Sequence, residues 1–113
     1  MPVDGLAVAA AREIRRRACE PITLATIVEA LPATYRTIDR HFRKAFGRSM
    51  GEELVRSRIN EAARLLAETH LPLRLVADRV GYASTAYFAN TFSKHTGTPP
   101  GAYRKAHQRR EHG

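Results

Sequence analysis

The sequence contains an internal repeat, because its second half matches its first at an offset of fifty residues. Each copy has an apolar stretch, a short break, a hydroxyl residue suited to capping a helix, apolar residues four apart and a closing glycine. The equivalent pairs are Ala33 and Ala83, Thr34 and Ser84, Ile38 and Phe88, Phe42 and Phe92, Lys44 and Lys94, Gly47 and Gly97, and Gly51 and Gly101. A chain of 113 residues with this repeat is expected to form one domain, or two very small modules that share a core.

Helix start and stop signals predict an all-α fold with about seven short helices. Ser49 and Glu52 have the spacing of a capping box at the start of the longest helix. No alternating β-branched run bounded by turns is present, so no strands are expected. The predicted helices cover about residues 5–19, 23–31, 34–47, 50–69, 75–80 and 84–97, with a last short helix from Pro99 and Pro100 that holds Tyr103.

Apolar residues at helical spacing identify the predicted core of each helix. The expected core residues are Leu6, Ala10, Ile14 and Cys19; Leu24, Ile27 and Val28; Tyr35, Ile38, Phe42 and Ala45; Val55, Ile59, Ala62 and Leu66; Leu75, Val76, Ala77 and Val80; and Phe88 and Phe92. We expect these positions to define stability rather than specificity.

The order of the helices predicts the domain organisation. We expect an N-terminal helix (1–20), a first helix-turn-helix subdomain (21–49), a connector helix (50–70), a second helix-turn-helix subdomain (71–107) and a basic tail (108–113). The second helix of such a unit can enter the major groove of DNA. A single copy is weak evidence, because any corner between two helices looks similar, but two copies in equivalent register are much stronger. A connector of about 20 residues is ~30 Å long, close to the ~34 Å between adjacent major-groove faces of B-DNA.

Charge and cysteine content narrow the class of partner. The 19 Lys and Arg residues against 11 Asp and Glu give a net charge of +8, which attracts polyanions such as nucleic acid or an anionic membrane. The single cysteine, Cys19, excludes an internal disulfide and is consistent with the cytoplasm. No apolar run approaches the ~20 residues of a membrane span, and no signal peptide is expected at the N-terminus.

The sequence resembles the DNA-binding domain of the AraC/XylS-type bacterial transcription regulators. The resemblance covers about residues 22–104 and rests on Ala77-Asp78-Arg79-Val80-Gly81-Tyr82, Ser84, Tyr87-Phe88, Phe92, Gly97 and Pro99-Pro100-Gly101-Ala102-Tyr103-Arg104. It implies two helix-turn-helix subdomains that bind promoter DNA through two successive major-groove segments. Within the family, residues 14–19 resemble the sugar-responsive regulators, such as those of xylose use.

The first recognition helix carries an arginine stripe. Arg36, Arg40 and Arg43 follow i, i+4, i+7 spacing, and the arginine fork pairs bidentately with guanine or phosphate. The resemblance implies base contacts at Arg36, Asp39 and Arg40. Asp39 either accepts from a cytosine amino group or orients Arg36 or Arg43, and we favour orientation because phosphates repel an unpaired carboxylate. The expected phosphate contacts of this copy are Thr34, Arg43, Lys44 and Arg48.

The second recognition helix is less charged. The resemblance implies base contacts at Thr85, Ala86 and Asn90, where Asn90 suits adenine and Ala86 a thymine methyl. The expected phosphate contacts are Ser84, Ser93 and Lys94, and the basic residues Arg104, Lys105, Arg109 and Arg110 could approach the backbone. We therefore expect the first copy to dominate affinity and the second to tune sequence choice.

Competing functions find less support in the sequence. No catalytic or metal-binding spacing occurs, so no enzyme, cofactor or metal is expected. His41 and His95 are expected to be partly buried packing residues, and Cys19 a half-buried thiol rather than one with a lowered pKa. The first helix is too rich in alanine for firm membrane insertion. A helical protein-interaction module without sequence-specific DNA binding remains the alternative.

The resemblance also implies partners beyond DNA. A regulator of this family is expected to contact RNA polymerase. The effector-binding or dimerisation domain that accompanies the module has no room in 113 residues, so the chain is expected to be a fragment or a stand-alone monomer. The target promoter, the effector and the sign of regulation are left open.

Overall fold

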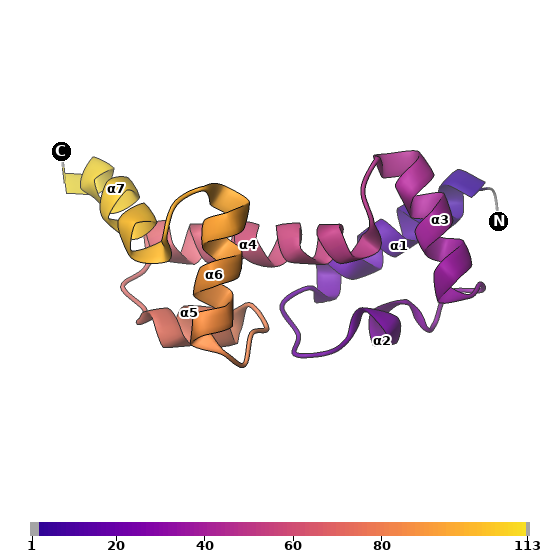
Figure 1. The fold of residues 1–113 in the computed structure, drawn as a ribbon, viewed down its shortest axis with the longest axis horizontal. Helices are drawn as coiled ribbons and strands as arrows, with labels where there is room; N and C mark the ends of the chain where they lie inside the picture. Colours follow the sequence, from indigo (N-terminus) through magenta and orange to yellow (C-terminus); the bar gives the residue numbers. More distant parts are fainter. Residues whose placement is uncertain (1–2, 113) are drawn as a thin grey trace. The chain divides into compact units, whose positions relative to one another are not determined.

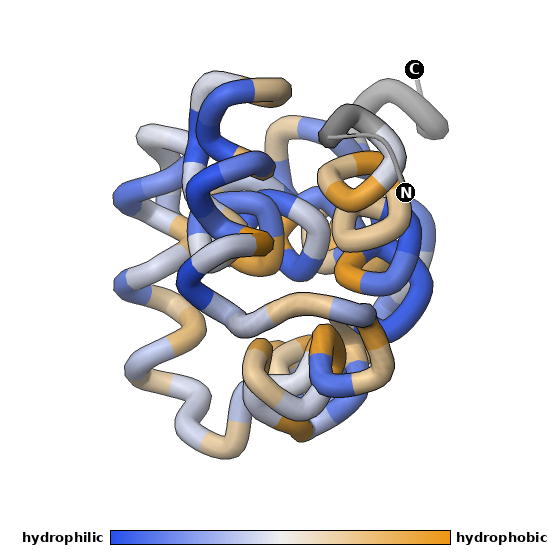
Figure 2. Tube along the Cα trace, turned by 90° about the vertical axis from the view of Figure 1, so that its right-hand side faces the viewer, coloured by the Kyte–Doolittle hydropathy of each residue, from blue (hydrophilic) through white to orange (hydrophobic). Residues whose placement is uncertain are grey.

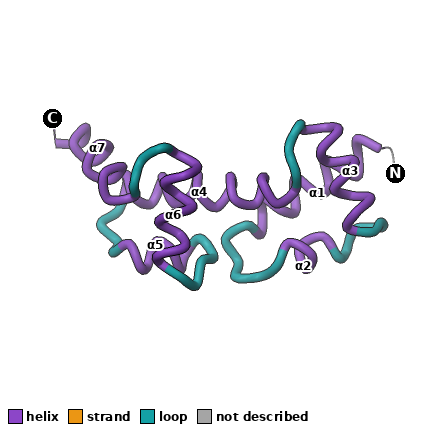
Figure 3. The backbone as a smooth tube through the Cα atoms, in the orientation of Figure 1, coloured by secondary structure: helices purple, strands orange, loops and turns teal. Residues whose placement is uncertain are grey.

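The computed structural model describes the backbone of residues 3–112 and the side chains of residues 5–108. This part of the chain folds into seven α-helices joined by loops and contains no strand, as the sequence predicts (Figures 1 and 3). The helices are α1 (Val3–Arg17), α2 (Leu24–Val28), α3 (Tyr35–Phe46), α4 (Met50–Glu68), α5 (Leu73–Arg79), α6 (Thr85–Thr96) and α7 (Pro100–His112).

Side-chain caps begin the helices where the sequence predicts them. Thr23, Thr34 and Ser84 each accept a hydrogen bond from the backbone N–H three residues further on. The capping box also forms: Ser49 Oγ accepts from the Glu52 N–H at 3.0 Å, and Glu52 Oε1 accepts from the Ser49 N–H at 3.3 Å. These bonds satisfy backbone donors that have no partner inside a helix.

Helices α3 and α6 end in the same way. Gly47 and Gly97 adopt left-handed conformations, with φ of 73° and 79°, and donate their N–H groups to the carbonyls of Arg43 and Ser93. Only glycine adopts this conformation without steric cost. The glycine stops of the repeat are therefore confirmed.

Three predictions about helix limits and faces were wrong. The first helix ends at Arg17, so Cys19 lies beyond it in the turn before Pro21. Tyr35 and Ala45 are exposed, because they lie in the first and last turns of α3 and the small core covers only the middle of that face. Leu75 is exposed because it points away from the face of α5 on which Val76 and Ala77 are buried.

The last helix is longer than expected. It continues to His112, so the backbone of most of the predicted basic tail is helical. The side chains of Arg109 and Arg110 lie outside the described residues.

One compact unit contains α1, α2, α3 and the first part of α4. Its core is apolar, and Ile14, Ile38, Phe42 and Met50 are completely buried in it. Blue and orange alternate along the helices in Figure 2, as expected for helices with one polar and one apolar face. Burial of these faces fixes the orientation of α3 within the unit.

The second unit contains the last part of α4 together with α5, α6 and α7. Phe88 and Phe92 are completely buried, with ring centroids 5.9 Å apart. Tyr103 of α7 packs edge-on against Phe92, with ring centroids 5.4 Å apart, and this contact holds α7 against α6. Within the described residues, no helix is long and apolar enough to cross a membrane.

Candidate nucleic-acid interface

The outer face of α3 carries two exposed arginines. Arg36 and Arg40 lie one turn apart and are exposed, whereas Ile38 and Phe42 on the other face are completely buried. Within the described residues, neither arginine forms a side-chain hydrogen bond or ion pair. Both guanidinium groups are therefore available to an external acceptor such as guanine or phosphate.

Asp39 lies beside this stripe and is engaged by the protein. Its Oδ2 accepts from Arg43 Nε at 2.8 Å, and its Oδ1 accepts from the backbone N–H of Met50 at 2.9 Å. Burial alone would raise the pKa of this carboxyl group, but the bonds from Met50 and Arg43 outweigh burial and lower it. The geometry agrees with orientation, the role we favoured, and the partner is Arg43 rather than Arg36.

Arg43 and Arg48, both predicted phosphate contacts, are paired within the protein. Arg43 is mostly exposed, with 60% of its side chain accessible, so its bond to Asp39 leaves most of the guanidinium open to solvent. Arg48 is only 26% accessible, and its Nε donates to Glu53 Oε1 at 2.6 Å. Lys44 is exposed on the last turn of α3. Of these three residues, Arg48 is the least available to DNA.

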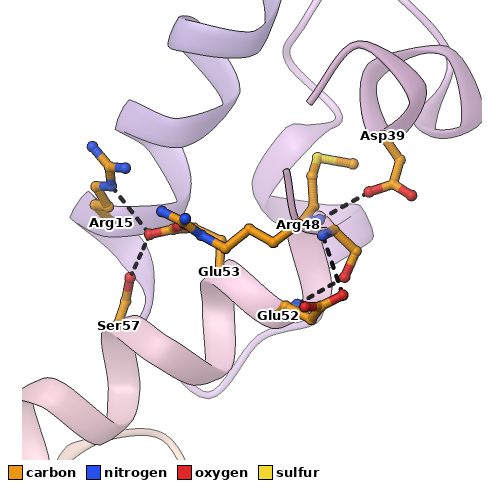
Figure 4. A network of polar contacts seen from close by, with 8 residues as sticks. Arg15, Asp39, Arg48, Glu52, Glu53 and Ser57 are labelled. Carbon is orange, nitrogen blue, oxygen red and sulfur yellow. Dashed lines mark hydrogen bonds and ion pairs between the residues drawn. The ribbon is translucent and has the colours of Figure 1, made fainter. Parts of the chain in front are cut away.

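Glu53 is the centre of a polar network that the sequence analysis missed (Figure 4). Glu53 is only 3% exposed, and its carboxylate accepts from Arg48, from Arg15 Nε at 3.2 Å and from Ser57 Oγ at 3.4 Å. Burial raises the pKa of Glu53, but the hydrogen bonds and charges of Arg48 and Arg15 lower it more, so that the carboxylate stays ionised. The network joins α1, the α3–α4 loop and α4 within the first unit.

The outer face of α6 offers different chemistry. Ala86, Asn90 and Lys94 are exposed, whereas Thr85 and Ser93 are partly buried. Within the described residues, no basic side chain occupies the positions equivalent to Arg36 and Arg40, because Ala86 and Asn90 stand there. This face is suited to apolar and amide contacts with base edges.

Tyr87 is an outward-facing residue that the sequence analysis did not name as a contact. It is 63% exposed in the first turn of α6, and its ring lies 5.8 Å from that of Tyr82. Its position in the sequence, directly after Ala86 and three residues before Asn90, could have indicated that it lies on the outer part of the same helix. A phenol held there can donate to a phosphate oxygen or pack against a sugar.

Three titratable residues were considered for other functions, and within the described residues no group of three or more His, Cys, Asp or Glu side chains could hold a metal ion. His41 is partly buried as expected, but His95 is exposed, so its predicted packing role was wrong. Burial and the charge of Glu61 raise the pKa of the Cys19 thiol, despite a smaller opposing effect of Arg58. The alternative of a lowered thiol pKa was therefore wrong.

Comparison with known proteins agrees with this architecture. A family model described as a helix-turn-helix domain matches residues 27–106. A putative AraC-like transcription regulator of Streptomyces lividans is 35% identical over 83 residues, which are 74% of this chain and 27% of that protein. The chain belongs to the AraC-type helix-turn-helix domains.

Solved structures of AraC-type domains have the same fold. The C-terminal domain of AraT, a response regulator from Geobacillus stearothermophilus, superposes with a TM-score of 0.87 at 29% identity and covers 94% of this chain and 88% of that one. The DNA-binding domain of the global transcriptional factor AdpA, in complex with a target DNA, has a TM-score of 0.78 at 28% identity and covers 96% and 95%.

Two further comparisons concern the wider family. Xylose operon regulatory proteins of Haemophilus influenzae and Escherichia coli are among the relatives, at 25% and 26% identity. This AraC-type domain spans less than a third of the length of these curated relatives.

Proposed function

We propose that this AraC-type domain binds double-stranded promoter DNA sequence-specifically, with α3 and α6 as recognition helices in two successive major-groove segments. The observation that carries the proposal is the pair of exposed arginines on α3, Arg36 and Arg40, whose guanidinium groups form no bond within the described residues. Helix α3 is packed against its unit by a buried apolar face and is capped at both ends, as α6 is. The structural similarity to the DNA-binding domain of AdpA, which is in complex with a target DNA, supports DNA binding by this fold.

Each recognition helix has a distinct role in this proposal. Arg36 and Arg40 read bases by bidentate hydrogen bonds, and Lys44 and Arg43 contact phosphates. In α6, Asn90 and Ala86 contact base edges, assisted by Thr85, while Lys94 and Ser93 lie near the backbone. The N-caps Thr34 and Ser84 stand at helix N-termini, where backbone N–H groups attract phosphate. Arg48 pairs with Glu53 rather than with DNA, so it supports binding by stabilising the α3–α4 loop.

Selection from random duplexes tests the proposal most directly. At moderate salt, the domain should enrich duplexes with two conserved sequence blocks about one helical turn apart. Affinity for the enriched sequence should fall steeply with salt concentration, because several phosphate contacts release counterions. Enrichment of a single block would refute the use of two grooves, and no enrichment would favour a protein-interaction module.

Two alanine variants test the ranking of the two helices. Arg40→Ala should weaken binding to the selected duplex more than Asn90→Ala, because it removes a charge-assisted bidentate contact rather than a neutral one. A loss of about 5- to 160-fold is expected for Arg40→Ala, which corresponds to about 1–3 kcal/mol for a good bidentate pair. Both residues are exposed, so thermal unfolding should change little and serves as the control. A larger loss from Asn90→Ala would contradict the ranking.

The wider role is proposed from the relatives. We infer that the domain works within a transcription regulator in the bacterial cytoplasm, that the regulator contacts RNA polymerase, and that an effector-binding domain belongs to it. The coverage of less than a third of each relative supports the existence of such further parts in those proteins.

A further inference from the structure

Three positions that are hydrogen-bonded to one another in the first copy of the repeat all differ in the second copy. In the first copy, Asp39 accepts hydrogen bonds from Arg43 and from the N–H of Met50. The equivalent residues of the second copy, fifty positions later, are Ala89, Ser93 and Pro100. The acceptor, its arginine and the N–H donor are therefore all replaced in the second copy.

The difference at the third position explains the difference at the first. Met50 and Pro100 are the first residues of α4 and α7, where a backbone N–H has no partner inside the helix. Proline is favoured at this position because it has no N–H to satisfy. In the first copy, Met50 has a backbone N–H without a helical partner, and the carboxylate of Asp39 accepts from it. In the second copy, Pro100 has no N–H, and the residue equivalent to Asp39 is Ala89. This pairing follows the demands of the backbone rather than those of a base.

The geometry points to a positioning role for Asp39, and the inference rests on the proposed function of α3. We propose that Asp39 ties the recognition helix to the first turn of α4 and holds Arg43, and that it does not itself contact a base. Its two oxygens accept from two protein donors at 2.9 and 2.8 Å, and only 17% of its side chain is accessible. Figure 4 shows the carboxylate of Asp39 turned toward the start of α4.

The tie has a consequence for specificity. Arginine has several rotatable bonds, and an exposed arginine loses conformational entropy when it binds. The bond from Nε to Asp39 restricts Arg43 before DNA arrives, and it also places one negative charge beside the phosphates. Asp39 therefore lowers affinity for any duplex while it keeps Arg43 in a single arrangement. Removing the charge should raise non-specific binding and leave the choice of bases unchanged.

Two substitutions separate the two bonds. Asp39→Asn keeps an oxygen that can accept from Met50 N–H but loses the charge that holds Arg43, whereas Asp39→Ala loses both. We expect the urea midpoint to fall clearly for Asp39→Ala and much less for Asp39→Asn. Equal loss in both variants would overturn the tie to Met50. This measurement needs no DNA, so it stands even if the proposed function fails.

The DNA measurements use the duplex selected for the wild-type domain and a set with single base-pair changes, under conditions where every variant is folded. Asp39→Asn should bind an unrelated duplex several-fold more tightly, with a salt dependence steeper by about one counterion, and should keep the wild-type preference at every base pair. Asp78→Asn, an equal charge change at an exposed residue of α5, is the control. A preference lost at one base pair would show that Asp39 reads a base and would overturn the proposal. A wild-type domain without sequence preference would instead overturn the proposed function.

Discussion

Substitution of Glu53 by glutamine should destabilise the domain by about 2 kcal/mol at neutral pH. The amide keeps the shape of the side chain but loses the charge that three donors share, at 2.6 Å from Arg48, 3.2 Å from Arg15 and 3.4 Å from Ser57. A hydrogen bond to a charged group contributes about 1.5–3 kcal/mol. The ion pair with Arg15 contributes less to the free energy of unfolding, because 53% of the Arg15 side chain is exposed and solvent screens the charge. The pair with Arg48, whose side chain is 26% exposed, therefore accounts for most of the expected loss.

The loss from Glu53→Gln should depend on pH in a defined direction. The folded pKa of Glu53 lies below 4.5, its ordinary value in the unfolded chain. The carboxylate therefore stabilises the fold fully above pH 4.5, and this stabilisation disappears as the pH falls through the folded pKa. The difference between the wild type and the variant should be constant from pH 7 to 5 and should shrink below pH 4.5.

The assay is urea unfolding followed by circular dichroism at pH 7, 5, 4 and 3, with hydrogen exchange of the α3 amides to report on the first unit alone. Glu13→Gln is the matched control, because Glu13 also pairs with an arginine, Arg16 at 2.8 Å, but on the surface of the same unit. It should cost less than about 0.5 kcal/mol. Equal effects of the two substitutions, or a Glu53→Gln effect that persists unchanged at pH 3, would refute the reasoning.

Two further predictions use the second unit. Gly97→Ala should lower the free energy of unfolding by about 1 kcal/mol, because its φ is 79° but an added Cβ would meet no atom within 4 Å. Gly81→Ala should lower it by about 2–3 kcal/mol, because its φ is 97° and the Cβ would also lie 3.1 Å from the Glu20 carbonyl oxygen and from Arg58 Nε. Equal midpoints in thermal unfolding would contradict this difference. Cys19 should react with iodoacetamide more slowly than free cysteine at pH 7.5, because its thiol pKa is raised, and a faster reaction would show that Arg58 outweighs burial.

The parts of the fold that the sequence predicted are those set by local signals. A cap such as Thr34 or Ser84 acts on a backbone N–H three residues away, and a glycine stop acts on its own φ. The buried positions of α3 and α6 repeat every four residues. Such signals lie within one turn of the chain, so spacing alone locates them. The repeat added a second, independent example of each signal.

The polar contacts between elements could not be predicted in the same way. Glu53 bonds to Arg15, 38 residues earlier, and Asp39 bonds to Met50, 11 residues later. In the sequence, Glu53 is one of two adjacent glutamates. The capping-box spacing from Ser49 identifies Glu52 as the residue that caps α4, but nothing in the spacing indicates that Glu53 is buried. Which carboxylate enters the protein depends on the packing of α1 against the rest of its unit. The base contact that the resemblance implies for Asp39, and the phosphate contact expected for Arg48 from its place after the first recognition helix, were predicted without knowledge of this packing.

The two copies show how one scaffold accommodates different outer faces. In α3 and α6, the caps satisfy the backbone groups at the helix ends and the buried faces supply the apolar packing. The outward-facing residues therefore do not contribute to stability unless they contact another helix or loop. Ala86 and Asn90 are free in this sense, as are Arg36 and Arg40. Asp39 is not, because the N–H of Met50 depends on it. Under the proposed function, substitutions that change the DNA sequence preference should therefore cost least stability at Arg36, Arg40, Ala86 and Asn90. At Asp39, any new side chain must also accept from α4 or be accompanied by a proline at position 50.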